Sequence, residues 1–183
     1  MAKLDIVLLG DARLRRKSKP IRKFNADLQQ LAADMVETMR ASHGVGLAAP
    51  QIGRNERLIV VEMPEEGFEE DPQAGQLHIV VNPEIVRARG EVAAGDEGCL
   101  SIPGYIGEVE RPSQVTIKGL DVAGKPIRVR AYDYLARIFL HEIDHLEGVL
   151  FIDHIQTPGK LRRLLHNPET DEWYEEPVTG PLE

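Results

Sequence analysis

The chain has 183 residues, 42% of them hydrophobic and 28% charged, a composition that fits one folded domain with a buried core. Its formal net charge of −8 opposes nonspecific binding to nucleic acids, because a polyanion is repelled at long range. No apolar run approaches the ~20 residues that span a bilayer, and the run at 6–9 is too short for the core of a signal peptide. The single cysteine, Cys99, cannot form an intrachain disulfide. We therefore expect a cytoplasmic protein without membrane or specific DNA partners.

The N-terminal part of the chain is predicted to contain one helix. Residues 13–23 include seven lysines and arginines, which we interpret as a solvated surface, with contact to ribosomal RNA as the alternative. Between residues 27 and 40, apolar side chains recur at the spacing i, i+3, i+4, i+7, and Asn25 can cap the start. This helix is expected to pack on the core.

Two strands separated by a loop are expected next. The glycine-rich stretch SHGVGLAAPQIG at 42–53 precedes LIVVE at 58–62, which is typical of a buried strand. Residues 63–76 are acidic and interrupted by proline and glycine, which predicts a surface loop. LHIVV at 77–81 predicts the second strand, and the Asn-Pro pair at 82–83 is expected to end it.

A hairpin and a second helix follow. Residues 114–120 and 125–132 alternate between polar and apolar side chains on either side of the turn sequence DVAG, which predicts antiparallel neighbours. From 133 to 146 the apolar spacing becomes helical, and Gly148 is a natural helix end. The segment HEIDH at 141–145 therefore lies in the last turns of a helix.

The C-terminal part is predicted to be peripheral. Residues 1–157 are interpreted as a single catalytic domain, and residues 158–183 as a short helix at GKLRRLLH followed by an acidic tail without regular structure. Because hairpins connect the strands, the expected fold class is α+β, with antiparallel sheets packed around the central helix that carries HEIDH.

HEIDH has the residue types and spacing of a metal site. Positions i and i+4 share one face of a helix, so His141 and His145 can hold one ion. Glu142 is next to them and can take a proton from metal-bound water, as in metallohydrolases. The alternative is a chance pair of surface histidines.

The third protein ligand has to come from another part of the chain, since a catalytic site usually has three ligands and leaves one position for water. A metzincin would have a histidine where this chain has Phe151, and a thermolysin-like third glutamate could come only from the tail. Upstream, Cys99 would complete a Cys/His/His set. A lone buried cysteine is otherwise usually a small hydrophobic residue.

Three motifs together resemble one family. GVGLAAPQ at 44–51, EGCLS at 97–101 and HEIDH at 141–145 occur in the order and approximate spacing found in the peptide deformylases. The resemblance covers about residues 3–157. It implies a hydrolase that removes the formyl group from the N-terminal formylmethionine of nascent polypeptides and releases formate.

The resemblance also implies the metal ligands. Cys99, His141 and His145 would bind one divalent ion. The resemblance implies that the native ion is Fe(II) and that zinc, nickel or cobalt can replace it. A Cys/His/His set suits several of these metals.

Roles for the remaining site residues follow from the same resemblance. Glu142 would act as general base and then as general acid while metal-bound water attacks the formyl carbon. The side-chain amide of Gln51 and the backbone N–H of Leu100 would stabilise the oxyanion. Val45 and Gly46 would pair with an extended substrate.

Several assignments stay open. Ile138, one turn before His141 and Glu142, is a candidate for the methionine pocket. Glu97 and Asp144 could orient a ligand histidine. Alternatively, Asp144 could be a solvated charge on the helix, and Glu97 could anchor an arginine such as Arg111. The alternative functions are an HExxH metallopeptidase and a noncatalytic, deformylase-like peptide-binding module.

Overall fold

The computed structural model describes residues 3–168 and 170–180. Within these ranges the chain forms two α-helices, one sheet of seven strands that differ in length, and three short 3-10 helices. The helices are α1 (Ala26–Ala41) and α2 (Asp133–Glu147). The strands are β1 (Gly46–Ala48), β2 (Leu58–Glu62), β3 (Leu77–Cys99), β4 (Ile102–Leu120), β5 (Pro126–Tyr132), β6 (Leu161–Asn167) and β7 (Glu172–Pro177).

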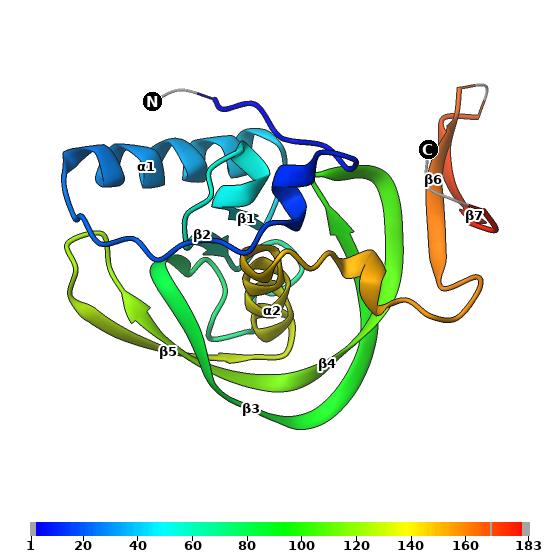
Figure 1. Cartoon of the computed structure of the whole chain (residues 1–183). Coiled ribbons are helices and arrows are strands. Elements are labelled where there is room, and N and C mark those ends of the chain that lie inside the picture. Colours follow the sequence, from blue (N-terminus) through cyan, green and yellow to red (C-terminus); the bar gives the residue numbers. More distant parts are fainter. Residues whose placement is uncertain (1–2, 169, 181–183) are drawn as a thin grey trace.

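The sheet curves around α2, and this confirms the predicted α+β fold. The strand order is β1-β2-β3-β4-β6-β7, β5 pairs with β4, and every pairing is antiparallel. Figure 1 shows α2 in the centre, with the long strands β3 and β4 and the shorter β5 around it. None of the described segments is a helix long and apolar enough to cross a membrane.

Strand β2 separates the two largest parts of the core. Ile59 and Val61 pack in the cluster that contains the apolar face of α2, whereas Leu58 and Val60 pack in the cluster that contains α1. Successive side chains of a strand point to opposite faces, so a strand buried on both faces is apolar at nearly every position. This explains why LIVVE lacks the polar and apolar alternation of a surface strand.

The two helices predicted from 27 to 40 and from 133 to 146 and the predicted hairpin are confirmed, with boundaries within a few residues. The side chain of Asn25 accepts a hydrogen bond from the N–H of Leu28 (3.1 Å) at the start of α1. Gly148 ends α2 with a φ of 77°, where a Cβ would lie 2.5 Å from the carbonyl oxygen of Arg15. A residue with a side chain would therefore be strained in conformation and would also clash.

The prediction that this strand ends at 82–83 is wrong, because β3 continues to Cys99. The register shifts between Val81 and Glu84, where Asn82 has a φ of 51°. The Asn82 side chain bonds the backbone N–H and C=O of Ile21, both at 2.8 Å. A β-bulge at this register shift accommodates one extra residue and also Pro83, which has no N–H to donate to the neighbouring strand. The strand therefore continues beyond it.

The prediction for the C-terminal part is also wrong in the described residues. GKLRRLLH does not form a helix; it contributes to β6, which pairs with β4 on one side and β7 on the other. The tail expected to lack regular structure contains β7. The unpaired edge of β4 offers backbone partners, and this tertiary pairing outweighs the local helical preference of the leucines and arginines. Residues 169 and 181–183 of the predicted tail lie outside the described residues.

Candidate active site

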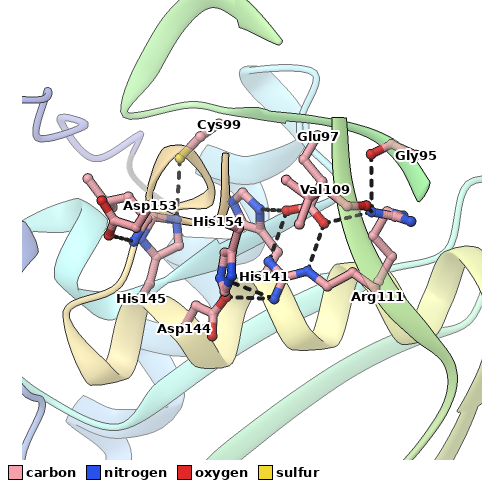
Figure 2. A network of polar contacts seen from close by, with 12 residues as sticks. Gly95, Glu97, Cys99, Val109, Arg111, His141, Asp144, His145, Asp153 and His154 are labelled. Atoms are coloured by element: carbon pink, nitrogen blue, oxygen red, sulfur yellow. Dashed lines mark hydrogen bonds and ion pairs between the residues drawn. The ribbon is translucent and has the colours of Figure 1, made fainter. Parts of the chain in front are cut away.

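A cysteine and two histidines meet between β3 and α2. The ligand atoms of Cys99, His141 and His145 all lie within 4.8 Å of one another. The sulfur of Cys99 is 3.3 Å from Nε2 of His145, and the two imidazole centroids are 5.0 Å apart. Figure 2 shows the cysteine approaching the α2 histidines from the β3 side.

Local structure accounts for this meeting. His141 and His145 are one turn apart on α2, so both rings project from the same side of the helix. Cys99 is the last residue of β3, where the β3–β4 register becomes irregular between Gly98 and Cys99. That irregularity turns the end of the strand towards the helix.

The donor set fits a divalent metal ion. The Nδ1 atom of His145 is buried without a hydrogen-bond partner among the described residues. Burial and the positive charge of His141 hold the pKa of His145 well below its ordinary value, which favours the neutral imidazole needed for ligation. Burial opposes a charge on His141, but hydrogen bonds to Cys99 and Glu97 outweigh it and raise the pKa of that ring. The two rings of the cluster therefore lie in different electrostatic surroundings, with Cys99 and Glu97 next to His141.

Glu97 orients the first histidine. Nδ1–H of His141 donates to Oε2 of Glu97 (2.9 Å), which leaves Nε2 of the imidazole for a metal. Arg111 donates to both carboxylate oxygens at 2.9 and 3.0 Å, and Arg137 donates to Oε1 at 2.9 Å. Burial opposes the charge of Glu97, but hydrogen bonds from His141 and Arg111 outweigh burial and lower its pKa to about 2.

Asp144 bonds Arg111 and His154 and neither of the two predicted ligand histidines. Its Oδ2 accepts hydrogen bonds from Arg111 (2.7 Å) and from Nε2 of His154 (2.8 Å). It therefore supports Arg111, which in turn holds Glu97, as the dashed contacts of Figure 2 show.

Glu142 is buried beside the ligands with one free oxygen. Its Oε2 has no hydrogen-bond partner among the described residues. Burial, together with the charges of Glu97 and Asp144, raises the pKa of Glu142 to about 7, the range in which a carboxyl group serves as both base and acid at neutral pH. A Cβ on Gly46 would lie 2.3 Å from Oε1 of Glu142. Glycine at this position makes room for the carboxylate.

Gln51 presents an amide N–H towards the ligand cysteine. Its Oε1 accepts a hydrogen bond from the N–H of Ala48 (2.8 Å), which fixes the orientation of the amide. Nε2 then lies 3.4 Å from the sulfur of Cys99 and 3.4 Å from Oγ of Ser101. The side chain is only 1% exposed, so its donor is held in a largely dry environment.

A cavity of about 410 Å³ opens onto these groups. Among the residues predicted for the site, those that line the cavity are Val45, Gly46, Gln51, Cys99, Leu100, Ile138, His141 and Glu142. His145 lies behind the wall and is 1% exposed.

Several lining residues were not identified from the sequence, among them Arg137 and Leu164. Arg137 lies four residues before His141, and this helical spacing was a signal that could have identified it. Leu164 comes from β6. Nothing in the local sequence links Leu164 to the three motifs.

Comparisons with known proteins agree on one family. The family described as polypeptide deformylase matches residues 3–161. A peptide deformylase from Thermomicrobium roseum is 48% identical over 180 residues, which cover 98% of this chain and 99% of that protein. One from Symbiobacterium thermophilum is 52% identical over 153 residues, covering 84% of this chain and 67% of that protein.

Solved structures give the same result. The crystal structure of a peptide deformylase from Synechococcus elongatus in complex with actinonin has a TM-score of 0.77 and 40% identity, covering 84% of this chain and 81% of that one. The crystal structure of a peptide deformylase from Thermotoga maritima has a TM-score of 0.78 and 36% identity, covering 86% of this chain and 100% of that one.

Proposed function

This chain belongs to the polypeptide deformylase family, metal-dependent hydrolases that remove the formyl group from N-terminal formylmethionine, and on that premise we propose how its own residues perform the reaction. Cys99, His141 and His145 hold the metal, and Glu142 moves the proton. The observation that carries this proposal is the cluster of three ligand atoms within 4.8 Å of one another, with the free oxygen of Glu142 buried beside it.

The ligand set supports a divalent metal of intermediate softness. We propose Fe(II) as the native ion, with zinc, nickel or cobalt as replacements, because one thiolate and two imidazoles suit all of them. When bound, such an ion lowers the pKa of a water molecule and polarises a carbonyl group.

Glu142 is the proton carrier. Oε2 of Glu142, which lacks a partner among the described residues, accepts a proton from the attacking water. The pKa of this carboxyl, raised to about 7 by burial, then lets the same oxygen return the proton to the departing amine nitrogen. One buried group therefore serves both steps.

Gln51 and Leu100 stabilise the charge that develops on the formyl oxygen. The amide of Gln51 is already oriented by Ala48, so its Nε2–H donates without reorganisation. The backbone N–H of Leu100, the residue directly after Cys99, supplies the second donor.

The substrate lies along the free edge of β1. The other edge of this strand pairs with β2, which leaves the backbone of Gly46 at its start for pairing with an extended peptide. Val45 directly precedes the strand and lines the cavity, but its C=O already accepts a hydrogen bond from the N–H of Glu62 (2.9 Å). Ile138 lines the cavity from α2 and contributes an apolar wall for the methionine side chain. Backbone pairing suits an enzyme that accepts many sequences after methionine.

The partners are nascent formylmethionyl polypeptides, and we place the reaction in the cytoplasm, where such chains are made. We interpret the basic stretch at 13–23 as a solvated surface and not as a ribosome contact. Arg13, Arg15 and Lys17 of this segment already form ion pairs with acidic groups of the same chain. Fewer of its charges are therefore available for RNA.

The test is formate release from a formyl-Met-Ala-Ser peptide by the metal-loaded protein. Glu142→Ala should abolish turnover and retain the metal, because the carboxylate is not a ligand. Glu110→Ala, at an exposed position of β4, should behave like the wild type. Near-normal turnover by Glu142→Ala would refute the assigned role.

The same assay separates the alternatives. Cleavage of internal amide bonds in unformylated peptides would favour a metallopeptidase. Peptide binding without formate release by the iron-, nickel- or cobalt-loaded protein would favour a noncatalytic binding module.

A further inference from the structure

The C-terminal hairpin of β6 and β7 contributes a side chain to the catalytic cavity. Leu164, in the middle of β6, lines the cavity together with residues of the metal site. The match to the family ends at residue 161, so nearly all of this hairpin lies beyond the segment that identifies the family. The Thermomicrobium roseum relative, in contrast, matches 98% of the chain.

Backbone pairing fixes β6 relative to the ligand cysteine. Ile106 of β4 pairs with Arg162 of β6 on one side and with Gly98 of β3 on the other. Gly98 directly precedes Cys99. Three neighbouring strands therefore set the position of the hairpin with respect to the metal site.

Side chains reinforce this position. Arg162 pairs with Asp96 at 2.5 Å and with Glu175 of β7 at 2.9 Å, and Asp96 itself lines the cavity. The guanidinium of Arg163 lies 5.9 Å from the ring centroid of Tyr105, a cation–π geometry. The hairpin is thus attached at the wall of the cavity by contacts on both faces of β6.

The geometry indicates which part of a substrate Leu164 can reach. Strands in a sheet are ~4.8 Å apart, so β6 is roughly 10 Å from the strand that carries Cys99. An extended peptide rises ~3.3 Å per residue, so this distance corresponds to about three residues. We therefore expect Leu164 to meet the residues that follow formylmethionine and not the formyl group at the metal site.

The side chain presented at this point is apolar. Arg162 precedes Leu164 by two positions and shares its face of β6, but Asp96 and Glu175 already engage its guanidinium. The leucine is therefore the group available to a substrate, and it favours burial of an apolar partner.

We propose that Leu164 is a specificity-determining residue, which contacts an apolar side chain at the second or third position after formylmethionine. The inference rests on the proposed deformylase activity of the same cavity. On this proposal the hairpin of β6 and β7 takes part in substrate selection, although nearly all of it lies beyond the residues that match the family.

The test compares kcat/KM for formyl-Met-Ala-Ala-Ala with that for peptides in which one alanine is replaced by leucine. The full-length, metal-loaded wild type should prefer leucine at the second or third position after methionine by roughly tenfold, the scale of a few methylenes in an apolar pocket. Leu164→Ala should reduce this ratio to near one.

Leu165→Ala is the matched control. It removes the same atoms from the adjacent residue of β6, which is not among the lining residues of the cavity, and should retain the leucine-to-alanine ratio. An equal change of the ratio in both variants would mean that the hairpin acts only through stability, and would overturn the proposal.

A charge variant provides an independent readout. Leu164→Glu should make lysine better than leucine at the responsive position, and an unchanged order of preference would overturn the proposal. If the wild type releases no formate from any of these peptides, the proposed function itself has failed. An active wild type with a leucine-to-alanine ratio near one at every position would refute only the role of Leu164.

Discussion

Glu142 depends on a residue that has no side chain. Gly46 lies so close that any Cβ would overlap the Glu142 carboxylate, and the buried carboxylate cannot move aside without disturbing packed neighbours. The space that the Glu142 carboxylate occupies therefore restricts the residue at another position, nearly 100 residues away in the sequence.

We predict that Gly46→Ala lowers kcat/KM for formyl-Met-Ala-Ser by about 100-fold, because displacing a catalytic group by about 1 Å has effects of this size. The metal content, measured by elemental analysis, should not change. Gly180→Ala is the control, since a Cβ at Gly180 has no atom within 4 Å. Wild-type activity in Gly46→Ala would contradict the proposed position of the carboxylate.

The low pKa of Glu97 predicts a loss of stability in acid. This pKa falls from an ordinary value of 4.5 to about 2 on folding, so the stabilisation is complete above about 4.5 and is lost as the pH falls towards about 2. About 3 kcal/mol is involved, from a shift of this size at 1.36 kcal/mol per unit.

The measurement compares the unfolding free energy of the metal-free wild type and Glu97→Gln by urea denaturation between pH 5 and pH 2. The wild type should lose its advantage over this range. Parallel curves would show that Glu97 has no such linkage.

The residues of the site were predictable where a motif carried them. His141, Glu142 and Cys99 stand in short patterns whose chemistry is visible in the sequence, and the structure brings them together. Leu164 was not predictable, because its place in the cavity depends on the pairing of β6 with β4.

Among the helices and strands, those with local sequence signals were predicted correctly, and those that depend on distant pairing partners were not. The first helix and the hairpin of β4 and β5 have local signals, namely the Asn25 cap, the apolar spacing and the DVAG turn. The continuation of β3 and the strand β6 depend on partners far away in the sequence. Local patterns do not contain that information.

The bulge in β3 yields a prediction of its own. Asn82→Ala removes two hydrogen bonds to the Ile21 backbone and makes a positive φ more strained. We expect a destabilisation of about 1–3 kcal/mol in urea unfolding. Asn55→Ala, at an exposed position, should change stability by less than about 0.5 kcal/mol. Equal effects of both substitutions would contradict the role of the bulge.

For the molecule as a whole, the proposed metal ligands lie at the end of one sheet strand and on the enclosed helix. Cys99 ends β3, and both histidines belong to α2, around which the sheet curves (Figure 1). A bound ion therefore crosslinks two parts of the core that are separated in the sequence.

Removal of the metal should lower the Tm. An ion present at 1,000 times its Kd stabilises the fold by about 4 kcal/mol, which corresponds to roughly 10 °C in a chain of this size. Thermal unfolding with and without a chelator measures the shift. His145→Ala lacks a ligand, so its Tm should respond much less to the chelator. A wild-type Tm that does not respond would argue against a metal in this cluster.

The two ends of the sheet differ in a way that bears on association between copies of the protein. At one end, β1 is apolar and has an edge suited to an incoming peptide. At the other end, β7 has the sequence EWYEEP, in which three glutamates and a terminal proline oppose the addition of another strand. If the substrate pairs with β1 as proposed, the chain uses one end of the sheet for its substrate, while the other end resists the edge-to-edge growth that leads to aggregation.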